Sequence, residues 1–430
     1  MTVVRFPYGR EFLEYDFPDS RFWGVIESAL DSYVSPHSPD ELIRVAICDP
    51  IGTLPLSELV YGKRKVVLLA SDHTRPVPSK LIVPQLFAEI RRGNPNAEIT
   101  ILIATGCHRK TTDDELVEKF GQKIFETENI VVHDCDNAEF VNLGKLPSGG
   151  DLVLNKIAID ADLLLSEGFI EPHFFAGFSG GRKSVLPGIA ARATVIYNHN
   201  AEFIADENSR TGIMQKNPIH DDMIFAARKA KLAFICNVIM NSKKEVIYAV
   251  AGDCEKAHVA GCSVLCKYCM ADAGQADIVV ASNGGFPLDQ NIYQAVKAMS
   301  TSKAAVKKNG VIIVLAKSND GHGGYHFHKT FADEKNLDNI LKTFIATPRS
   351  KTLVDQWQSQ IFAQILKHAT VIYISDAPDQ IVRDLHLIPA KSIAEALSAA
   401  EKILNNPNAT ITAIPDAVSV IVNNQNKKND

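Results

Sequence analysis

The sequence lacks an apolar run long enough to cross a membrane, and Asp and Glu interrupt even its most hydrophobic stretches. Residues 1–10 also lack the apolar core of a secretory signal, so we expect a cytoplasmic protein with no membrane partner. The sequence also lacks an excess of positive charge: its formal net charge is −5, which gives no electrostatic case for binding nucleic acid. With 46% hydrophobic and 22% charged residues over 430 positions, the composition is that of a globular protein of two domains.

Cysteine is too sparse for a disulfide scaffold, because only eight cysteines are spread over the whole chain. Cys262, Cys266 and Cys269 form the one tight group, and Cys254 is near enough in sequence to act as a fourth ligand. No second Cys or Cys/His motif follows, and the segment has helical spacing. We therefore expect buried or half-buried thiols there rather than a zinc or iron–sulfur site, and the role of these cysteines stays open.

From residue 65 onward, apolar strand patterns alternate with helical patterns, which predicts an α/β protein with two domains and mostly parallel sheets. We expect an N-terminal α/β domain over residues 1–273, completed by residues 406–424, and a C-terminal α/β domain over residues 274–405. Residues 410–422 are expected to form a closing strand that returns to the first domain, and residues 423–430 to fray. The other expected strands are 65–70, 99–104, 161–166, 232–240, 276–281, 311–316 and 369–375, and the expected helices include 80–92 and 253–270.

A glycine-rich stretch over residues 171–188 follows the buried strand at 161–166 and carries Lys183 between two histidines, His173 and His199. Its glycines allow the backbone to approach a ligand closely. A Walker loop needs glycine immediately before its lysine, and Arg182 holds that position, so we do not expect an ordinary nucleoside triphosphate site. The alternative is that the glycines only form a tight turn, but the presence of Arg182, Lys183 and two histidines in the same short stretch favours a functional site.

Polar residues also follow two successive predicted strands. Asp72 and Arg75 come directly after residues 65–70, and His108 comes after residues 99–104. Ligands of open α/β sheets bind beyond the carboxyl ends of strands, so these side chains lie where function is expected. Thr112 with Glu115 forms a capping box for the next helix.

In the second half, Gln290, Gln294 and Lys297 share one helix face, which a solvated surface would explain equally well.

Five stretches together resemble the nickel-dependent lactate racemase family, and the resemblance extends over residues 6–422. The stretch at 171–188 is highly specific, whereas Gly-His-Gly-Gly at 321–324 alone would not be. The resemblance implies two α/β domains with the active site in a cleft between them, and an isomerase that interconverts D- and L-lactate. The resembling stretches are 71–78, 104–108, 174–188, 287–297 and 320–324.

The resemblance also implies nickel and an unusual cofactor, pyridinium-3,5-bisthiocarboxylate mononucleotide, which together form a nickel-pincer nucleotide. Lys183 matches the lysine that holds this cofactor covalently through a thioamide, and His199 matches the nickel ligand. His108 and His173 match the acid/base pair that serves a reversible hydride transfer. A chain of this kind depends on cofactor-biosynthesis proteins as partners, and its oligomeric state cannot be predicted from the sequence.

The remaining site residues are likewise implied by the resemblance. The loop residues that contact cofactor and substrate match Asp72, His73, Thr74 and Arg75, with Arg75 also a substrate ligand. In the second domain, the substrate-binding residues match Gln294 and Lys297.

Two departures from the family pattern bear on the substrate. Cys107 stands where a bulkier aromatic is usual, and Tyr325-His326 follow Gly-His-Gly-Gly where an acidic residue is common. Lactate is the expected substrate, and another 2-hydroxy acid or a sugar acid epimerised with the same cofactor is the alternative. An alternative of another class is a non-catalytic nickel-cofactor or nucleotide-binding protein.

Overall fold

The computed structural model describes residues 2–424 and divides them into two compact units. Unit 2 comprises residues 30–199 and 206–267. Unit 1 comprises residues 2–29, 200–205 and 268–424, so the first and last parts of the chain belong to the same unit. Both units are α/β structures in which most neighbouring strands are parallel, as the alternation of strand and helix patterns predicts.

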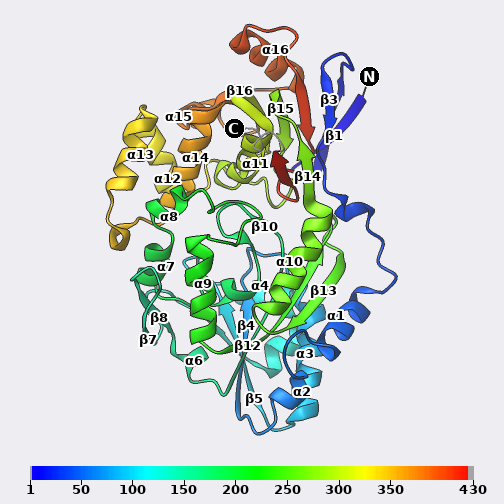
Figure 1. Cartoon of the computed structure of the whole chain (residues 1–430), viewed down its shortest axis with the longest axis vertical. Coiled ribbons are helices and arrows are strands. Elements are labelled where there is room, and N and C mark those ends of the chain that lie inside the picture. Colours follow the sequence, from blue (N-terminus) through cyan, green and yellow to red (C-terminus); the bar gives the residue numbers. More distant parts are fainter. Residues whose placement is uncertain (1, 425–430) are drawn as a thin grey trace. The chain divides into compact units, whose positions relative to one another are not determined.

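Unit 2 is built on a six-stranded sheet with the order β13-β12-β9-β4-β5-β6, in which only the β13–β12 pair is antiparallel. The central strand β9 is buried at all seven positions; it begins with three leucines, at residues 163–165, and also buries Ser166 and Glu167 near its carboxyl end. Figure 1 shows β4, β5 and β12 of this sheet with the helices of the same unit around them. The strands are β4 (Lys65–Ser71), β5 (Glu98–Ala104), β6 (Asn129–Val132), β9 (Leu163–Phe169), β12 (Leu232–Met240) and β13 (Val246–Gly252).

The helices of unit 2 cover this sheet with apolar faces. In α3, Ile82, Leu86 and Ile90 recur at helical spacing and are fully buried in the unit's apolar core. The predicted capping box of α4 is confirmed, because Thr112 and Glu115 each bond to the other's backbone N–H. The helices are α1 (Pro39–Cys48), α2 (Leu56–Leu59), α3 (Ser79–Gly93), α4 (Asp113–Phe120), α5 (Gln122–Thr127), α6 (Lys156–Ile159), α7 (Arg192–Asn198), α9 (Pro218–Lys229) and α10 (Lys256–Cys269).

Unit 1 contains a second six-stranded sheet, with the order β18-β17-β16-β15-β19-β3 and all neighbours parallel. Its strands are β3 (Phe22–Val25), β15 (Ala276–Ser282), β16 (Val306–Leu315), β17 (Thr370–Ile374), β18 (Ile388–Ala390) and β19 (Ile411–Ile414). The helices are α8 (Ala201–Ala205), α11 (Ile292–Ala305), α12 (Tyr325–Asp333), α13 (Leu337–Ala346), α14 (Gln356–His368), α15 (Asp379–Asp384) and α16 (Ile393–Leu404).

The two ends of the chain depart from the expected organisation. The expected closing strand is two strands, β19 and β20 (Ile421–Asn424), and neither joins unit 2. Ile411 of β19 pairs with Ile278 on one side and Phe22 on the other, so β19 lies inside the sheet of unit 1. The strand β20 pairs with β14 (Met270–Ala273) of the same unit. Residues 406–424 therefore complete the C-terminal unit; of the expected frayed tail, residues 425–430 lie outside the described residues.

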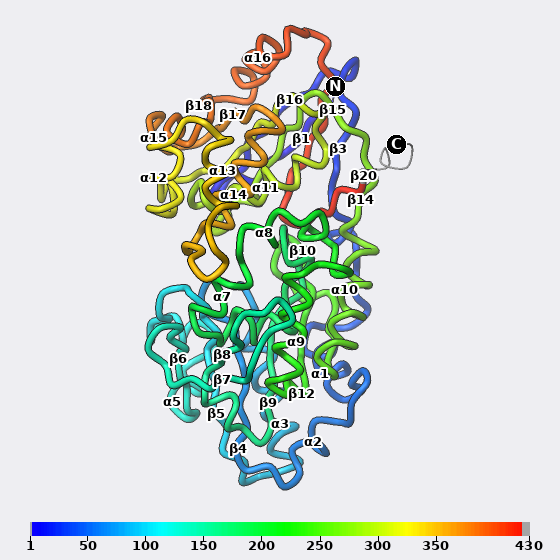
Figure 2. The backbone as a smooth tube through the Cα atoms, turned by 60° about the vertical axis from the view of Figure 1, so that its left-hand side comes forward, coloured from blue at the N-terminus to red at the C-terminus, as the bar shows by residue number. Residues whose placement is uncertain are grey.

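The first 29 residues also belong to unit 1 rather than to the unit that follows them in sequence. The strands β1 (Thr2–Tyr8) and β2 (Glu11–Phe17) form an antiparallel hairpin, and Phe6 and Phe17 from it are fully buried in the apolar core of unit 1. Figure 2 shows β1 and β3, in blue, beside β15 and β16. The alternation of apolar residues in β1 indicates a half-buried strand but does not identify the sheet that it covers.

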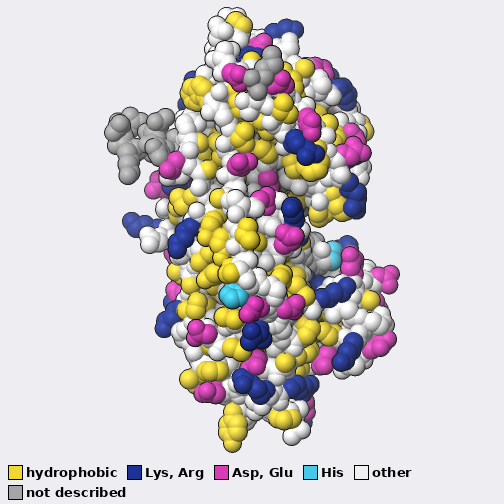
Figure 3. Space-filling model, turned by 90° about the vertical axis from the view of Figure 1, so that its right-hand side faces the viewer, with side chains coloured by type: hydrophobic (Ala, Val, Ile, Leu, Met, Phe, Trp, Pro, Cys, Tyr) yellow, Lys and Arg dark blue, Asp and Glu magenta, His cyan; other side chains and the backbone are white. Residues whose placement is uncertain are grey.

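The cysteine-rich segment is helical, as its spacing predicts: Cys262 and Cys269 are buried in α10 and Cys266 is half-buried. Within residues 2–424, no helix combines the length and the apolar character that a bilayer crossing requires. On the face drawn in Figure 3, acidic and basic side chains are interspersed rather than gathered by sign, in keeping with the small net charge.

Candidate active site

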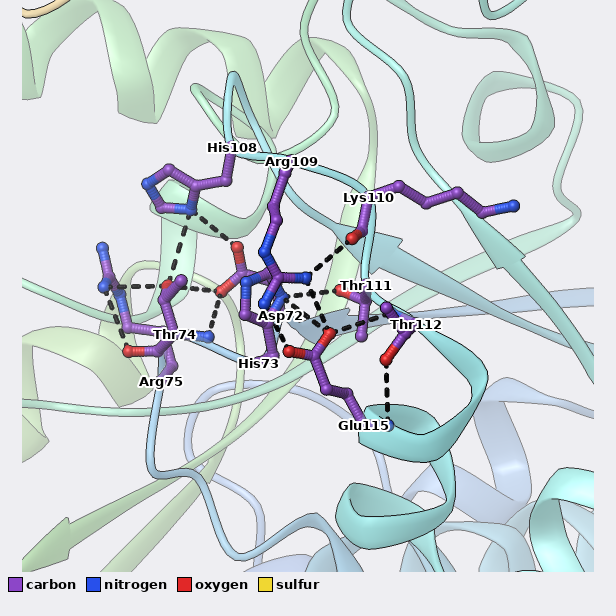
Figure 4. A network of polar contacts seen from close by, with 10 residues as sticks. All are labelled: Asp72, His73, Thr74, Arg75, His108, Arg109, Lys110, Thr111, Thr112 and Glu115. Atoms are coloured by element: carbon purple, nitrogen blue, oxygen red, sulfur yellow. Dashed lines mark hydrogen bonds and ion pairs between the residues drawn. The ribbon is translucent and has the colours of Figure 1, made fainter. Parts of the chain in front are cut away.

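Two loops at the carboxyl edge of the unit 2 sheet bring a carboxylate and an imidazole together. Ser71 at the end of β4 pairs with Ala104 at the end of β5, so the loops after these strands start side by side. Nδ1 of His108 lies 2.6 Å from Oδ2 of Asp72 (Figure 4). The other carboxylate oxygen accepts from Thr74, whose hydroxyl is 2.6 Å and whose backbone N–H is 3.1 Å away. Both oxygens of Asp72 are therefore engaged.

The surroundings of Asp72 keep it ionised. Burial alone would raise its pKa, since the residue is only 2% exposed, but the hydrogen bond and charge of His108, together with Arg75 and Thr74, hold the pKa well below its usual range. A carboxylate at Nδ1 fixes the imidazole proton on that nitrogen and leaves the lone pair on Nε2. His108 thus presents a basic nitrogen on the edge of the ring away from Asp72, from a side chain that is 47% exposed.

The other residues of the first loop point in different directions. Arg75 donates to the backbone oxygen and the hydroxyl of Thr74 at 3.4 Å and 3.1 Å, and both of these acceptors are neutral. His73 turns the other way, with Nδ1 3.1 Å from the Thr111 hydroxyl and 3.7 Å from Glu115 (Figure 4). Thr74 and Arg75 thus lie with the Asp72–His108 pair, whereas His73 contacts the start of α4.

The glycine-rich stretch brings a second group together around one aromatic ring. It contains the short hairpin of β10 (Pro172–His173) and β11 (Gly177–Phe178), followed by the 3-10 turn η2 (Gly181–Ser184). Nε2 of His173 is 3.4 Å from Nζ of Lys183. Lys183 Nζ lies 5.4 Å from the centre of the Phe175 ring, and the His199 ring meets the same ring edge-on at 5.1 Å. His173, Lys183 and His199 are therefore gathered, as the sequence predicts.

The two histidines of this group differ in their state. Nδ1 of His173 accepts the backbone N–H of Ala176 at 3.3 Å, which places the proton of a neutral imidazole on Nε2; the Lys183 ammonium 3.4 Å from Nε2 is also a donor, so these two groups do not hydrogen-bond in that tautomer. His199 ends α7 and is almost wholly buried. Its burial, reinforced by the charge of Lys183, lowers its pKa to about 3, so the imidazole is neutral and suited to a metal.

Arg182 lies beneath the glycine-rich loop and is fully buried. Its guanidinium donates to the carbonyl oxygens of Ala176, Phe178 and Gly180 at 2.7, 2.8 and 3.3 Å. It also donates through Nε to Nδ1 of His220 at 3.1 Å and lies 3.2 Å from Nε2 of His258. Burial lowers the pKa of Arg182 to about 10, and burial with the Arg182 charge lowers the pKa of His220 to about 3. One side chain thus holds three carbonyls of the loop that ends in Lys183.

Two loop glycines are required by the packing of the loop itself. Gly180 has a φ of +83°, and a Cβ there would lie 2.7 Å from the carbonyl oxygen of Phe169. The N–H of Gly181 donates to Oδ1 of the buried Asn237 at 2.8 Å, and a Cβ on Gly181 would lie 2.9 Å from the His258 ring. Close packing therefore accounts for glycine at these two positions, and the approach of the loop backbone to a ligand stays a prediction.

Gln294 and Lys297 belong to unit 1, unlike the other predicted site residues. Both are half-buried on α11, which Asn291 caps by accepting the backbone N–H of Gln294 at 3.0 Å. The helix begins at Ile292, so Gln290, which the sequence places on the same helix face as Gln294 and Lys297, precedes it.

Two family descriptions match the chain. "Lactate racemase N-terminal domain" matches residues 8–212 and "Lactate racemase C-terminal domain" matches residues 271–422, together more than half of the sequence. The chain belongs to the lactate racemase family. The lactate racemase of Thermoanaerobacterium thermosaccharolyticum is 49% identical over 424 residues, covering 98% of this chain and 99% of that protein. The lactate racemase of Lactiplantibacillus plantarum is 46% identical over 424 residues, covering 98% of this chain and all of that protein.

Solved structures agree with this membership. The lactate racemase apoprotein from T. thermosaccharolyticum matches with a TM-score of 0.95 and 48% identity, over 98% of this chain and 100% of that one. A protein from Thermotoga maritima matches with a TM-score of 0.64 at 19% identity, over 91% of this chain and 100% of that one, and shares the fold.

The residues that hold the glycine-rich loop in place could not be identified from the sequence. The sequence marks Arg182 as an exception to the Walker pattern and as a charge that favours a site, but not as the support of the loop, and no motif singles out His220, His258 or Asn237. These three lie far from the loop in sequence and reach it through α9, α10 and β12. The only usable signal was an arginine inside a buried glycine-rich stretch, where a charge needs partners.

Proposed function

We propose that this chain is a racemase that interconverts D- and L-lactate. The observation that carries the proposal is the pair of differently protonated histidines in one unit: His108 with a free Nε2 lone pair, and His173 with its proton on Nε2. A racemase needs one group that takes the hydroxyl proton and another that gives a proton back from the opposite side. Imidazoles are the side chains best matched to that exchange near neutral pH.

Each base has the support that its role needs. Asp72 holds the ring of His108 in one orientation and one tautomer, and it stabilises the imidazolium once Nε2 has taken a proton. The Ala176 N–H orients His173 in the same way. Proton transfer by a positioned group of this kind is worth about 10²–10⁴-fold in rate.

Arg75 is the residue that would hold the substrate carboxylate. Its guanidinium is next to the Asp72–His108 pair and donates to two neutral oxygens of Thr74, so a bidentate bond to a substrate carboxylate would not require it to break an ion pair with a hydrogen-bonded carboxylate. From unit 1, Lys297 would add a point charge and Gln294 a hydrogen bond to the substrate.

The residues present fit the nickel-pincer nucleotide that we propose as cofactor. The neutral imidazole of His199 would be this chain's ligand to the nickel, a metal for which an imidazole nitrogen is a suitable donor. Lys183 would hold the organic part covalently through its amine. Such a cofactor would supply reversible hydride exchange at the substrate carbon, a chemistry that avoids a carbanion beside an ionised carboxylate.

A different 2-hydroxy acid, or a sugar acid, is the second candidate. The half-buried Cys107 beside His108 is smaller than an aromatic residue and leaves more room for a longer substrate. Both candidates share the same residues and differ only in what surrounds the substrate carbon.

The test is to purify wild type and Lys183→Ala from a host shown to make the cofactor, and to measure intact mass, nickel content and lactate racemisation on the same samples. Lys110→Ala, at an exposed position of the same unit, is the matched control. We expect a lysine-dependent adduct with about one nickel, and lactate turnover, in wild type and in the control only. An adduct with nickel but no lactate turnover would favour another 2-hydroxy acid. The absence of both adduct and nickel in wild type would overturn the proposal.

A further inference from the structure

Two cysteines face each other next to the proposed catalytic His108. Cys107 and Cys135 lie in loops that follow the neighbouring parallel strands β5 and β6, where Ile103 pairs with Val132. Just past the ends of these strands, the His133 N–H donates to the carbonyl oxygen of Ile103 at 3.1 Å, and the Thr105 hydroxyl donates to the carbonyl oxygen of His133 at 2.7 Å. These bonds bring the loops together, and the two thiols two residues further on are in hydrogen-bonding contact.

The charges around the pair make the two sulfurs unequal. Asp136 forms a double ion pair with Arg192, with both N–O distances at 2.7 Å, and also accepts from Sγ of Cys135 at 3.7 Å. The hydrogen bond from Cys107 lowers the pKa of the Cys135 thiol, and the charge of Arg192 lowers it further. Burial and the charge of Asp136 act in the opposite direction. The same bond and burial raise the pKa of Cys107. Cys135 is therefore the thiol that loses its proton more readily, giving up its bond to Asp136 when it does, while Cys107 keeps its proton.

The position of Cys107 links this pair to the site. Cys107 precedes His108 within a tight turn in which the His108 N–H donates to Thr105 at 3.0 Å. Gly106, at φ +56°, donates to Gly188 at 2.9 Å, at the end of the glycine-rich stretch. Any movement of Cys107 toward Cys135 therefore pulls directly on the backbone that carries His108.

We propose that Cys107 and Cys135 form a disulfide on exposure to a peroxide, and that this crosslink switches off turnover by displacing His108. The Cys135 thiolate attacks one peroxide oxygen, which breaks the O–O bond, gives a sulfenic acid and releases hydroxide that is protonated to water. Cys107 then attacks that sulfur, the S–S bond forms, and the sulfenic oxygen leaves as water with the Cys107 proton. Two thiols lose two electrons, and the peroxide is reduced to two waters.

The structure allows this closure. The sulfurs must move from hydrogen-bonding contact to about 2.05 Å, and both belong to loops rather than to strand interiors. Cys107 is half-buried, so a small oxidant reaches the pair from the side of His108. Serine at either position would keep the shape and remove the reaction.

The experiment treats the full chain with hydrogen peroxide and maps disulfide-linked peptides by mass spectrometry before and after dithiothreitol. We expect a loss of two hydrogens and a Cys107–Cys135 linked peptide, both reversed by dithiothreitol. Cys107→Ser and Cys135→Ser should each abolish the linked peptide, and Cys48→Ser, at an exposed position of the same unit, should leave it. Oxygen adducts without a crosslink, or a crosslink between other cysteines, would overturn the proposed disulfide. The peptide map of the wild-type protein gives this answer even if one of the serine variants does not fold.

The proposed displacement of His108 rests on the proposed function, and it is tested by a separate measurement of lactate turnover. In loaded enzyme, oxidation should lower lactate turnover by about 10²-fold, as expected for displacement of a positioned base, and dithiothreitol should restore it. Unchanged turnover in a fully crosslinked sample would overturn the switch. Reduced, loaded enzyme without any lactate turnover would instead count against the proposed function, while the peptide map would still decide the disulfide.

Discussion

Nδ1 of His108 and Oδ2 of Asp72 are 2.6 Å apart, although 36 residues separate them in sequence. They meet because each follows one of two adjacent parallel strands, β4 and β5, at the same edge of the sheet. The carboxylate is buried and the imidazole is half exposed, so the pair has one fixed side and one side that faces solvent or substrate. This asymmetry is what a general base requires.

Replacing Asp72 with Asn should lower kcat for lactate by about 10²–10⁴-fold. The amide offers no negative charge to the protonated His108 and permits the wrong tautomer. The measurement is steady-state racemisation by loaded enzyme, with Asp114→Asn, at an exposed position on α4, as the control. Equal loss of kcat in both variants would argue against a special role for the pair.

Replacing His173 with Gln should abolish most turnover, by about 10²–10⁴-fold, while the Lys183 adduct and nickel are retained. The reason is that His173 lies 3.4 Å from Lys183 but does not itself carry the attachment. Intact mass and nickel content, measured beside turnover, separate the two effects. If His173→Gln and His108→Gln both kept full turnover, the racemase proposal would fail and a cofactor-binding protein would be favoured.

Stability should fall as the pH drops below about 6.5, in part because of His220. Burial and the Arg182 charge lower its pKa from 6.5 to about 3 in the folded chain, so between these values the unfolded chain binds a proton that the folded chain does not. His220→Gln should therefore flatten the fall by up to about 1.4 kcal/mol per pH unit. Urea unfolding at several pH values tests this, with His37→Gln, at an exposed position of unit 2, as the control. An unchanged slope in His220→Gln would contradict the assignment.

Replacing Arg182 with Met should destabilise unit 2 by roughly 2–5 kcal/mol and reduce the Lys183 adduct. Three buried loop carbonyls would lose the donor that fixes them. Arg182→Lys should lose less stability, because one ammonium can still serve part of this set. Thermal unfolding and intact mass are the measurements. A normal adduct in a destabilised Arg182→Met chain would show that Arg182 supports the fold but does not position Lys183.

Local elements of the fold could be predicted because their signals are local. The buried strand at Leu232–Met240 and the capping box of Thr112 and Glu115 follow from neighbouring residues alone. The partners of β19 could not be predicted in this way. Ile411 pairs with Phe22, and no property of either segment specifies a partner at that distance along the chain. The partner of such a strand depends on the packing of its side chains against the neighbouring strands of the folded sheet.

The same distinction applies to the site. The topology of parallel strands predicts that Asp72 and His108 converge, and they do. It does not predict that Arg182 would bond to His220 and lie against His258, because the partners of a buried cation come from whichever helices happen to cover it. The sequence likewise does not show that Gly180 packs against Phe169, because that contact comes from a strand that precedes the loop.

The membership of residues 2–29 in unit 1 has a consequence for how the chain is made. Residues 2–29 are synthesised before the strands that β3 and the β1–β2 hairpin pack against, β15, β16 and β19. Unit 2, whose sequence lies almost wholly between them, can be completed while Phe6 and Phe17 are still exposed to water. The apolar face of the hairpin therefore stays uncovered until the strands of unit 1 that follow unit 2 along the chain have been made.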